Sequence, residues 1–316
     1  MSADESISLR ATPVYAGVLA CTLAVTLWAL WQPFVLNGLT LALLGAALVL
    51  TGIPHGAVDH LVAARLFDTG GSWKGHVAFY GTYAALMAAY GAVWYVAPVA
   101  ALALFFLLTM YHFGQADLAY WRAPRGLDVA LYLSRGALLV GLPVAAHPAL
   151  VDPIFAALAG LHPAQWALCT TYQTTTLVVL VAQHVVVLGF AAALNAPAGG
   201  WREGLNTAVL TALFVVVHPL VAFAVYFGLW HSLGHILELL RFFRTRQGPT
   251  TLRGFYQKAA LYTLLSFVGL GVLYAVTQSF GLQHRMIALL FILISVLTLP
   301  HMLVVEGLYR TDPPPA

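Results

Sequence analysis

This sequence has few charged residues. Only 8% of its 316 residues are Asp, Glu, Lys or Arg, whereas 61% are hydrophobic. A soluble domain averages about 25% charged residues, so the composition predicts a polytopic membrane protein with little mass outside the bilayer. The net charge of +3 is small and scattered, which argues against a nucleic-acid surface.

Cysteine and the common catalytic motifs are also scarce. The two cysteines, Cys21 and Cys169, form no C-x-x-C motif, which argues against zinc ribbons and iron–sulfur clusters. The chain has no G-x-S-x-G sequence, no H-E-x-x-H sequence and no adjacent pair of histidines. No hydrolase elbow or nucleotide loop therefore competes for the role of active site.

Long apolar stretches are abundant. Crossing the bilayer takes roughly 20 helical residues, and stretches of that order run over 14–31, 36–60, 77–97, 98–121, 128–146, 170–194, 204–217, 219–241, 258–277 and 286–309. We expect an all-α transmembrane bundle of about 8–10 spanning helices, with residues 204–241 divided at Pro219 because proline breaks helices. Residues 14–309 then form a single membrane domain between a polar tail, 1–13, and a disordered Pro-rich tail, 310–316.

The basic residues predict how the bundle is oriented. With the N-terminus inside, the cytoplasmic loops hold Arg65, Lys74, Arg122, Arg125, Arg202, Arg241, Arg244, Arg246, Arg253, Lys258 and Arg310. The opposite loops hold Arg285 as their only basic residue. Because short cytoplasmic loops are enriched in Lys and Arg, we expect a multi-pass protein of the inner or plasma membrane with both termini cytoplasmic.

Histidines inside the apolar stretches are the most informative residues present. They lie in I-P-H-G-A-V-D-H-L, M-Y-H-F-G-Q-A-D-L, G-L-W-H-S-L-G-H-I-L-E and L-P-H-M-L-V-V-E-G-L, as His55, His112, His231, His235 and His301. A polar ring buried in lipid is costly unless it finds a partner. In the predicted topology these four stretches run in one direction and place the rings at similar depth, so the rings can converge on one metal ion.

The candidate ligands are His55, His112, His231 and His235. His231 and His235 are four residues apart, so both rings face one side of a helix. Neutral imidazole suits Zn, Cu, Fe or Ni, and the spacing alone does not choose among these metals. His301 is a fifth ligand, a hydrogen-bonding partner of the site or part of the pocket wall.

Carboxylates and aromatic residues extend the candidate site. Asp59 and Asp117 follow His55 and His112 closely and are expected to accept hydrogen bonds from the outer ring nitrogens of metal-bound histidines. Glu238 and Glu306 are expected to be solvated near the interface. The apolar surroundings favour a lipophilic substrate that arrives from the bilayer. The candidate pocket residues are Tyr111, Phe113, Tyr226, Phe227 and Trp230.

Four segments resemble, in order and spacing, those of the bacterial and archaeal membrane β-carotene 15,15′-dioxygenases: G-I-P-H-G-A-V-D, Y-H-F-G-Q-A-D, W-H-S-L-G-H and L-P-H-M. The resemblance covers Gly52 to Glu306 and leaves out the first apolar stretch. It implies a non-haem Fe(II) enzyme that splits the central double bond of β-carotene with O2 into two all-trans-retinal molecules. It also implies a functional link to a microbial rhodopsin. The ligands that it implies are His55, His112, His231 and His235, with no catalytic residue beyond the metal site.

Three alternatives fit the histidines less well. A membrane di-iron desaturase or hydroxylase of a lipid needs roughly twice as many ligands, typically with adjacent histidines. A metal or proton transporter would be expected to show inverted repeats with paired broken helices, whereas only the region near Pro219 looks broken. A zinc-dependent hydrolase would need an H-E-x-x-H general base.

Overall fold

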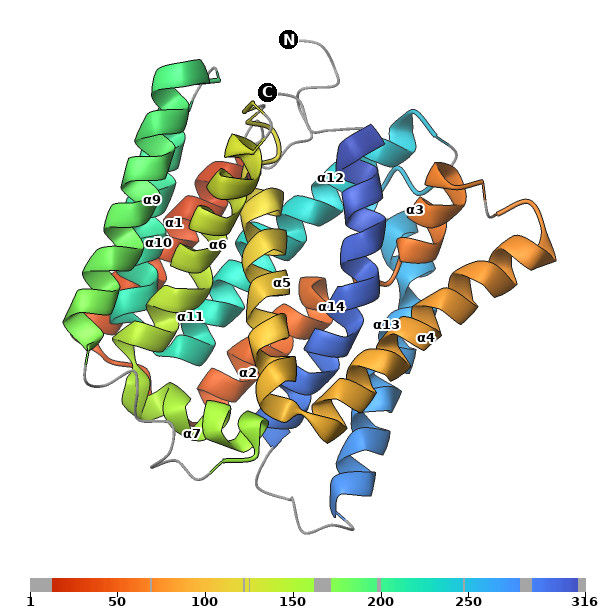
Figure 1. Cartoon of the computed structure of the whole chain (residues 1–316), viewed down its shortest axis with the longest axis horizontal. Helices are drawn as coiled ribbons and strands as arrows, with labels where there is room; N and C mark the ends of the chain where they lie inside the picture. Colours follow the sequence, from red (N-terminus) through yellow and green to blue (C-terminus); the bar gives the residue numbers. More distant parts are fainter. Residues whose placement is uncertain are drawn as a thin grey trace.

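The computed structural model describes residues 13–68, 70–121, 123–124, 126–161, 172–197, 200–246, 248–278 and 286–311 (Figure 1). Within these ranges the regular secondary structure is helical and no strand is formed, which confirms the predicted all-α fold class. The predicted tails fall almost entirely outside the described residues.

The helices follow the apolar stretches closely. The first half of the chain forms α1 (Pro13–Trp31), α2 (Gly38–Ala47), η3 (Leu48–Gly52), α3 (Asp59–Leu66), α4 (Trp73–Val96), α5 (Pro98–Leu118) and α6 (Leu127–Ala146). The second half forms α7 (Pro148–Ala159), α9 (Gln173–Asn195), α10 (Trp201–Val216), α11 (Pro219–Val225), η5 (Tyr226–Ser232), α12 (Leu233–Arg244), α13 (Leu252–Gln278) and α14 (Met286–Thr311). The elements η3 and η5 are π-helical.

Among the described residues, seven helices are long and apolar enough to cross a membrane, so the protein is a multi-pass membrane protein. They are α1, α5, α6, α9, α13, α14 and the continuous helix Pro219–Arg244 made by α11, η5 and α12. Three other predicted spans do not meet that description. Residues 36–60 are interrupted, α10 has only 16 residues, and α4 is long enough at 24 residues but is not among the seven.

Two breaks in the helices determine where histidines lie. The predicted break at Pro219 is confirmed: α10 ends at Val216, and the His218 side chain caps α11 by accepting a hydrogen bond from the Leu220 amide. The stretch 36–60, expected as one helix, instead becomes turns over residues 53–58. His55 therefore lies in a turn between η3 and α3, and its side chain is buried.

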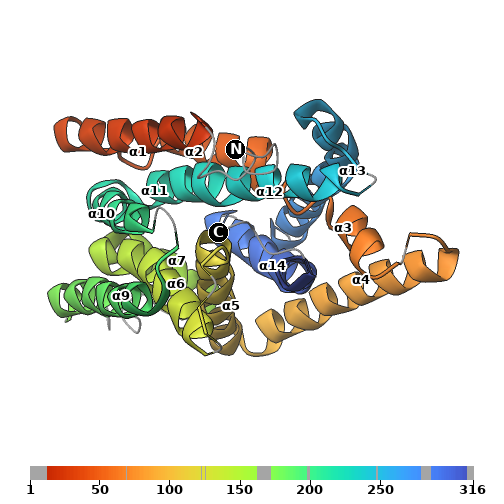
Figure 2. The same ribbon diagram turned by 90° about the horizontal axis from the view of Figure 1, so that it is seen from above.

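The bundle has two rows of helices with α14 between them. Figure 2 shows the continuous helix α11–η5–α12, with α1 and α2 outside it, on one side of α14, and α9, α6, α5 and α4 on the other. In Figure 1, α5, α12 and α14 all run from the end of the bundle where α7 lies towards the opposite end. The helices that carry His112, His231, His235 and His301 therefore run in the same direction.

The packing of α5 against α6 depends on two glycines. A Cβ on Gly114 of α5 would lie 1.8 Å from the Tyr132 carbonyl oxygen of α6, and one on Gly136 of α6 would lie 1.7 Å from the Met110 carbonyl oxygen of α5. Small residues let membrane helices approach closely, because helix association in lipid relies on van der Waals packing. This contact holds the helix that contains His112 in place.

Candidate metal centre

Five histidine side chains from four stretches of the chain meet inside the bundle. They are His55, His112, His231, His235 and His301, and all are buried. The ring centroid of His231 lies 5.2 Å from that of His55 and 4.9 Å from that of His112. The His301 ring lies 4.9 Å from His55 and 5.2 Å from His112. His235 is slightly further out, at 5.7 Å from His55 and 5.6 Å from His301.

Contact between the two π-helical segments places His55 beside His231. The Thr51 hydroxyl donates a hydrogen bond to the Gly228 carbonyl at 2.9 Å. A Cβ on Gly52 would lie 2.7 Å from the Phe227 ring, so only glycine allows this approach without a shift. π-Helical turns inside α-helices occur frequently at functional sites, and here each one lies next to or contains a clustered histidine.

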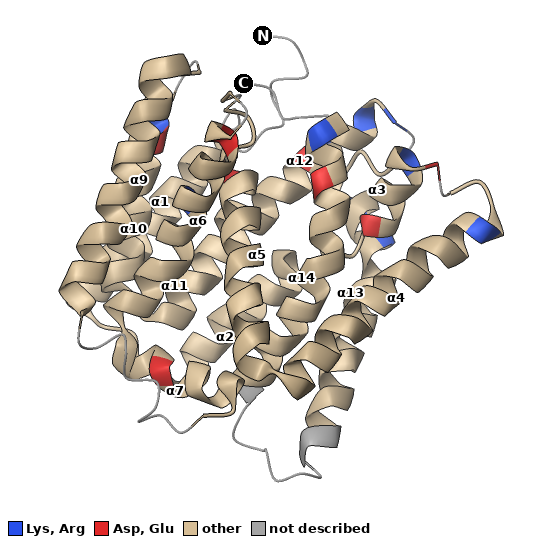
Figure 3. Cartoon of the chain, viewed as in Figure 1, with Lys and Arg blue, Asp and Glu red and all other residues tan. Residues whose placement is uncertain are grey.

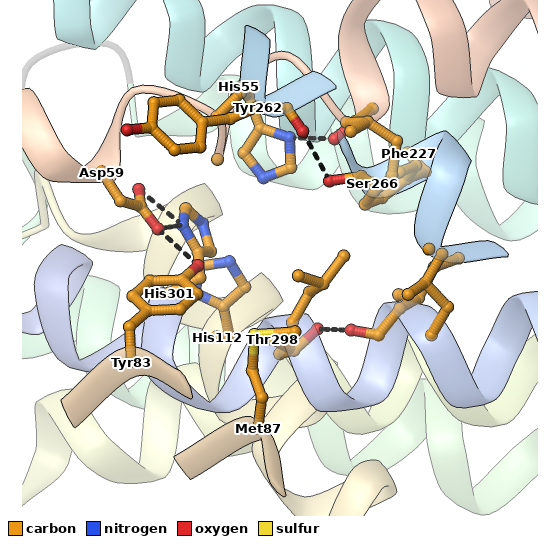
Figure 4. Close-up of a pocket in the computed structure, with 18 of the residues that line it drawn as sticks. His55, Asp59, Tyr83, Met87, His112, Phe227, Tyr262, Ser266, Thr298 and His301 are labelled. Carbon is orange, nitrogen blue, oxygen red and sulfur yellow. Dashed lines mark hydrogen bonds and ion pairs between the residues drawn. The ribbon is translucent and has the colours of Figure 1, made fainter. Parts of the chain in front are cut away.

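Hydrogen bonds fix the orientation of two rings. The Nδ1 atom of His55 contacts the Gly52 carbonyl oxygen, and the His301 Nδ1 lies 2.9 and 3.0 Å from the two carboxylate oxygens of Asp59 (Figure 4). Asp59 also accepts a hydrogen bond from the Tyr83 hydroxyl at 3.0 Å. An outer contact of this kind sets the tautomer of a histidine and leaves Nε2 available to a metal.

Asp59 was expected to support its neighbour His55, and the structure shows that it contacts His301 instead. Glu238 also differs from expectation. It was expected to be solvated, but its carboxylate lies 3.6 Å from the His235 Nδ1 and accepts a hydrogen bond from the Tyr309 hydroxyl at 2.8 Å. The i,i+3 spacing and the approach of α14 bring this carboxylate over the ring. Sequence reasoning missed Tyr83, because no motif marks its position on α4.

Several buried histidine nitrogens have no hydrogen-bond partner among the described residues and are available to bind a metal ion. Both nitrogens of His112, both of His231 and the Nε2 of His301 have no hydrogen-bond partner among the described residues. An unpaired buried polar atom costs about 1–3 kcal/mol, which a bound metal would remove. One nitrogen from each of His55, His112 and His231 lies within 4.8 Å of the others. Three buried imidazoles so arranged can bind a metal ion.

Asp117 belongs to a different polar cluster. Its carboxylate lies 2.8 Å from the Arg135 guanidinium and accepts a hydrogen bond from the Tyr226 hydroxyl at 3.3 Å. Arg135 is fully buried and also donates to Thr207, and it lies 4.0 Å from Glu203. The contact expected between Asp117 and a clustered histidine is thus replaced by a buried ion pair, which the sequence did not reveal.

An apolar cavity of about 320 Å³ adjoins the histidines. His55, His112, His231 and His301 line it together with residues from α4, α5, α13 and α14, several of which Figure 4 labels. The residues that sequence reasoning missed include Tyr83, Met87, Tyr262, Ser266, Leu297 and Thr298.

The predicted aromatic pocket residues divide into two groups. Phe113 and Phe227 line the cavity beside the histidines. Tyr111 instead donates a hydrogen bond to Glu306 at 3.2 Å, and Trp230 donates one to the Thr22 hydroxyl at 2.9 Å within the core. Tyr226 lines a second, smaller cavity.

Comparison with known proteins identifies the family of this chain. The sequence matches the family described as BCD: Beta-carotene 15,15′-dioxygenase over residues 46–309. It is 30% identical over 329 aligned residues to a "Probable beta-carotene 15,15′-dioxygenase Blh" of Halobacterium salinarum, an alignment covering 97% of this chain and 91% of that protein. It is 22% identical over 270 residues to a "Beta-carotene 15,15′-dioxygenase" of an uncultured marine bacterium, covering 84% and 92%. No solved structure matches. The chain therefore belongs to the β-carotene 15,15′-dioxygenase family.

Proposed function

We propose that this protein is an iron-dependent dioxygenase that cleaves the central 15,15′ double bond of β-carotene with O2 to give two molecules of all-trans-retinal. The observation that carries the proposal is the cluster of buried histidines facing an apolar cavity, in a chain of this family. The retinal would then serve a rhodopsin in the same membrane.

The donor set suits a catalytic metal. We propose His55, His112, His231 and His235 as the ligands of Fe(II), with His301 oriented by Asp59 beside them. A structural zinc site would be expected to use cysteine ligands, whereas imidazoles suit iron. When bound, iron supplies the one-electron chemistry that lets O2 react with an alkene.

The other contribution of the chain is to position the substrate. The cavity wall is largely apolar, with rings such as Phe113 and Phe227 beside the histidines. Such a wall binds a polyene and excludes bulk water, so the double bond is held in one orientation near the reacting centre. No described residue needs to act as a general acid or base, because two aldehydes form without net proton transfer.

Electron balance predicts that no reductant is needed. Cleavage of one C=C bond to two C=O bonds uses the four oxidising equivalents of one O2. Purified protein in detergent, given β-carotene and O2 alone, should therefore produce two retinals per carotene with O2-derived oxygen in both. A strict requirement for NADPH or ferredoxin, together with two irons per chain, would instead support the desaturase alternative.

We also propose that both termini are cytoplasmic. Figure 3 shows that most charged residues lie at the end of the bundle where α12 and α14 finish, whereas α7, with Asp152, lies at the opposite end. The Lys- and Arg-rich end of a multi-pass membrane protein faces the cytoplasm. This orientation places the proposed iron site somewhat towards that side of an inner or plasma membrane.

A further inference from the structure

The cavity beside the histidines shares a wall with a second cavity. The second cavity has a volume of about 100 Å³. Four residues line both cavities, namely Phe105, Thr109, Phe113 and Phe223. Thr109 lies almost one helical turn before His112 on α5. The shared wall therefore adjoins the proposed iron site.

Residues of α4 and α13 line part of the first cavity. Leu265 of α13 lines it and is also 51% exposed, so the cavity reaches the surface of the bundle beside this residue. The Tyr80 hydroxyl of α4 forms a hydrogen bond with the Tyr262 hydroxyl of α13 at 2.5 Å, and His60 of α3 lies against Tyr262 with ring centroids 4.6 Å apart. These contacts link α3, α4 and α13 beside the cavity, and a lipophilic molecule from the bilayer can reach it past the exposed Leu265.

The second cavity extends away from that opening towards α6 and α7. Val140 and Val144 of α6 line it, as do Val151 and Phe155 of α7. None of its lining residues carries a charge. A cavity so lined has the chemistry to hold a hydrocarbon chain and little else.

Central cleavage of a symmetric polyene requires equal halves on both sides of the reacting bond. The histidines line only the first cavity and lie next to the shared wall. A β-carotene whose midpoint lies at these histidines must therefore extend in two directions. One half can occupy the first cavity, between the histidines and the bilayer.

Resting on the function proposed above, we propose that the second cavity receives the other half of the polyene. The wall between the cavities is suited to such a passage. Thr109 is the one small residue among three phenylalanines, and its hydroxyl has no hydrogen-bond partner among the described residues. Its role is therefore to leave space. The Phe223 ring packs against other rings, stacked on Phe227 at 5.0 Å and tilted against Phe291 at 5.6 Å, so it can turn aside without losing a polar contact.

The test is to fill the second cavity and compare two substrates. Val144→Trp reduces the space available beyond the shared wall, whereas Leu133→Trp adds the same ring to the 38% exposed, outer side of the same helix. The substrates are β-carotene and β-apo-8′-carotenal, which lacks one ring-bearing end. In Val144→Trp, kcat/KM for β-carotene should fall by about tenfold or more relative to that for the apocarotenal, a typical penalty for a misfit in an apolar pocket. Leu133→Trp should leave this ratio unchanged.

Iron content and thermal unfolding of each variant check that the bundle is intact. If Val144→Trp does not retain iron, the smaller change Val140→Phe on the same lining face takes its place. A parallel loss for both substrates, or the same ratio in Val144→Trp and Leu133→Trp, would overturn the inference. Failure of the proposed function itself looks different, because wild-type protein would then yield no retinal from either substrate.

Discussion

At the residue scale, each of the four proposed ligands should be needed to retain iron. Replacing His55, His112, His231 or His235 by Ala removes one of four imidazoles, and the remaining three should hold Fe(II) much less tightly. Iron per purified chain should fall from about one to well below one, as measured by elemental analysis. His184→Ala is the matched control, since His184 is equally buried but contacts Ser134 on the far side of the bundle.

His301 should behave differently from the four proposed ligands. Its Nε2 faces the cluster, but Asp59 already occupies its other nitrogen. His301→Ala should therefore reduce retinal formation more than it reduces iron content. A loss of iron as complete as in His231→Ala would show that His301 is itself a ligand.

Neutral substitutions of the two aspartates should have different effects, one on the metal site and the other on stability. Asp59→Asn weakens the contact that orients His301 and should lower iron affinity or turnover by about 10–100-fold. Asp117→Asn should act on stability, because it leaves the buried Arg135 without its closest carboxylate. Breaking a buried ion pair costs about 3–5 kcal/mol, which thermal unfolding in detergent would detect. Equal effects of both changes on iron, with no change in stability, would contradict this division.

These aspartates also show the limit of reasoning from sequence spacing. The sequence indicated that Asp59 has a partner near the metal, but His301, the partner found, is 242 residues away along the chain. The role of Asp117 depends on Arg135, which lies in the middle of an apolar stretch with no local sign of a partner. Contacts between helices that are far apart in the chain depend on how the helices pack, and the spacing of residues along the sequence does not reveal this packing.

At the element scale, the sequence indicated which apolar stretches carry the clustered histidines. It did not indicate the π-helical segments and the turn in which some of these histidines lie. The predicted break before α11 was confirmed. It could be predicted because proline lacks a backbone N–H donor and interrupts a helix. The π-helical segments η3 and η5, and the turn that contains His55, leave no comparable mark in the sequence. Gly52 and Gly228 lie where these segments pack closely, since a Cβ on Gly52 would meet the Phe227 ring and one on Gly228 would meet Ala47.

The packing of α5 on α6 gives a prediction about elements. Gly114→Ala or Gly136→Ala places a methyl group against a backbone carbonyl, so the helices must separate. Overpacking of this kind costs about 1–3 kcal/mol or more, and both variants should unfold at lower temperature and lose iron as His112 shifts. Gly189→Ala on α9, where a Cβ meets nothing within 4 Å, is the control and should match wild type. Wild-type stability in Gly114→Ala would mean that the two helices are not in close contact.

At the scale of the whole molecule, hydropathy and charge were sufficient for the fold class and most helix bounds. The cavities were not predictable, because each is lined by residues from several helices. Phe113 and Phe227 were identified as pocket residues since they lie on the apolar stretches that carry the histidines, whereas Tyr83 and Thr298 reach the cavity through the packing of α4 and α14.

The orientation of the bundle is the last prediction, and it depends on the distribution of charge. The segment between α12 and α13 follows the arginines at the end of α12, and the positive-inside rule places it in the cytoplasm. In a background with Cys21 and Cys169 replaced by Ser, Thr250→Cys should react with a membrane-impermeant maleimide only after the cells are opened. Val96→Cys, 78% exposed at the far end of α4, should react in intact cells. Reversal of the two reactivities would invert the bundle and move the proposed iron site towards the external side. It would leave the histidine cluster intact, because the parallel course of α5, α12 and α14 does not depend on which end faces the cytoplasm.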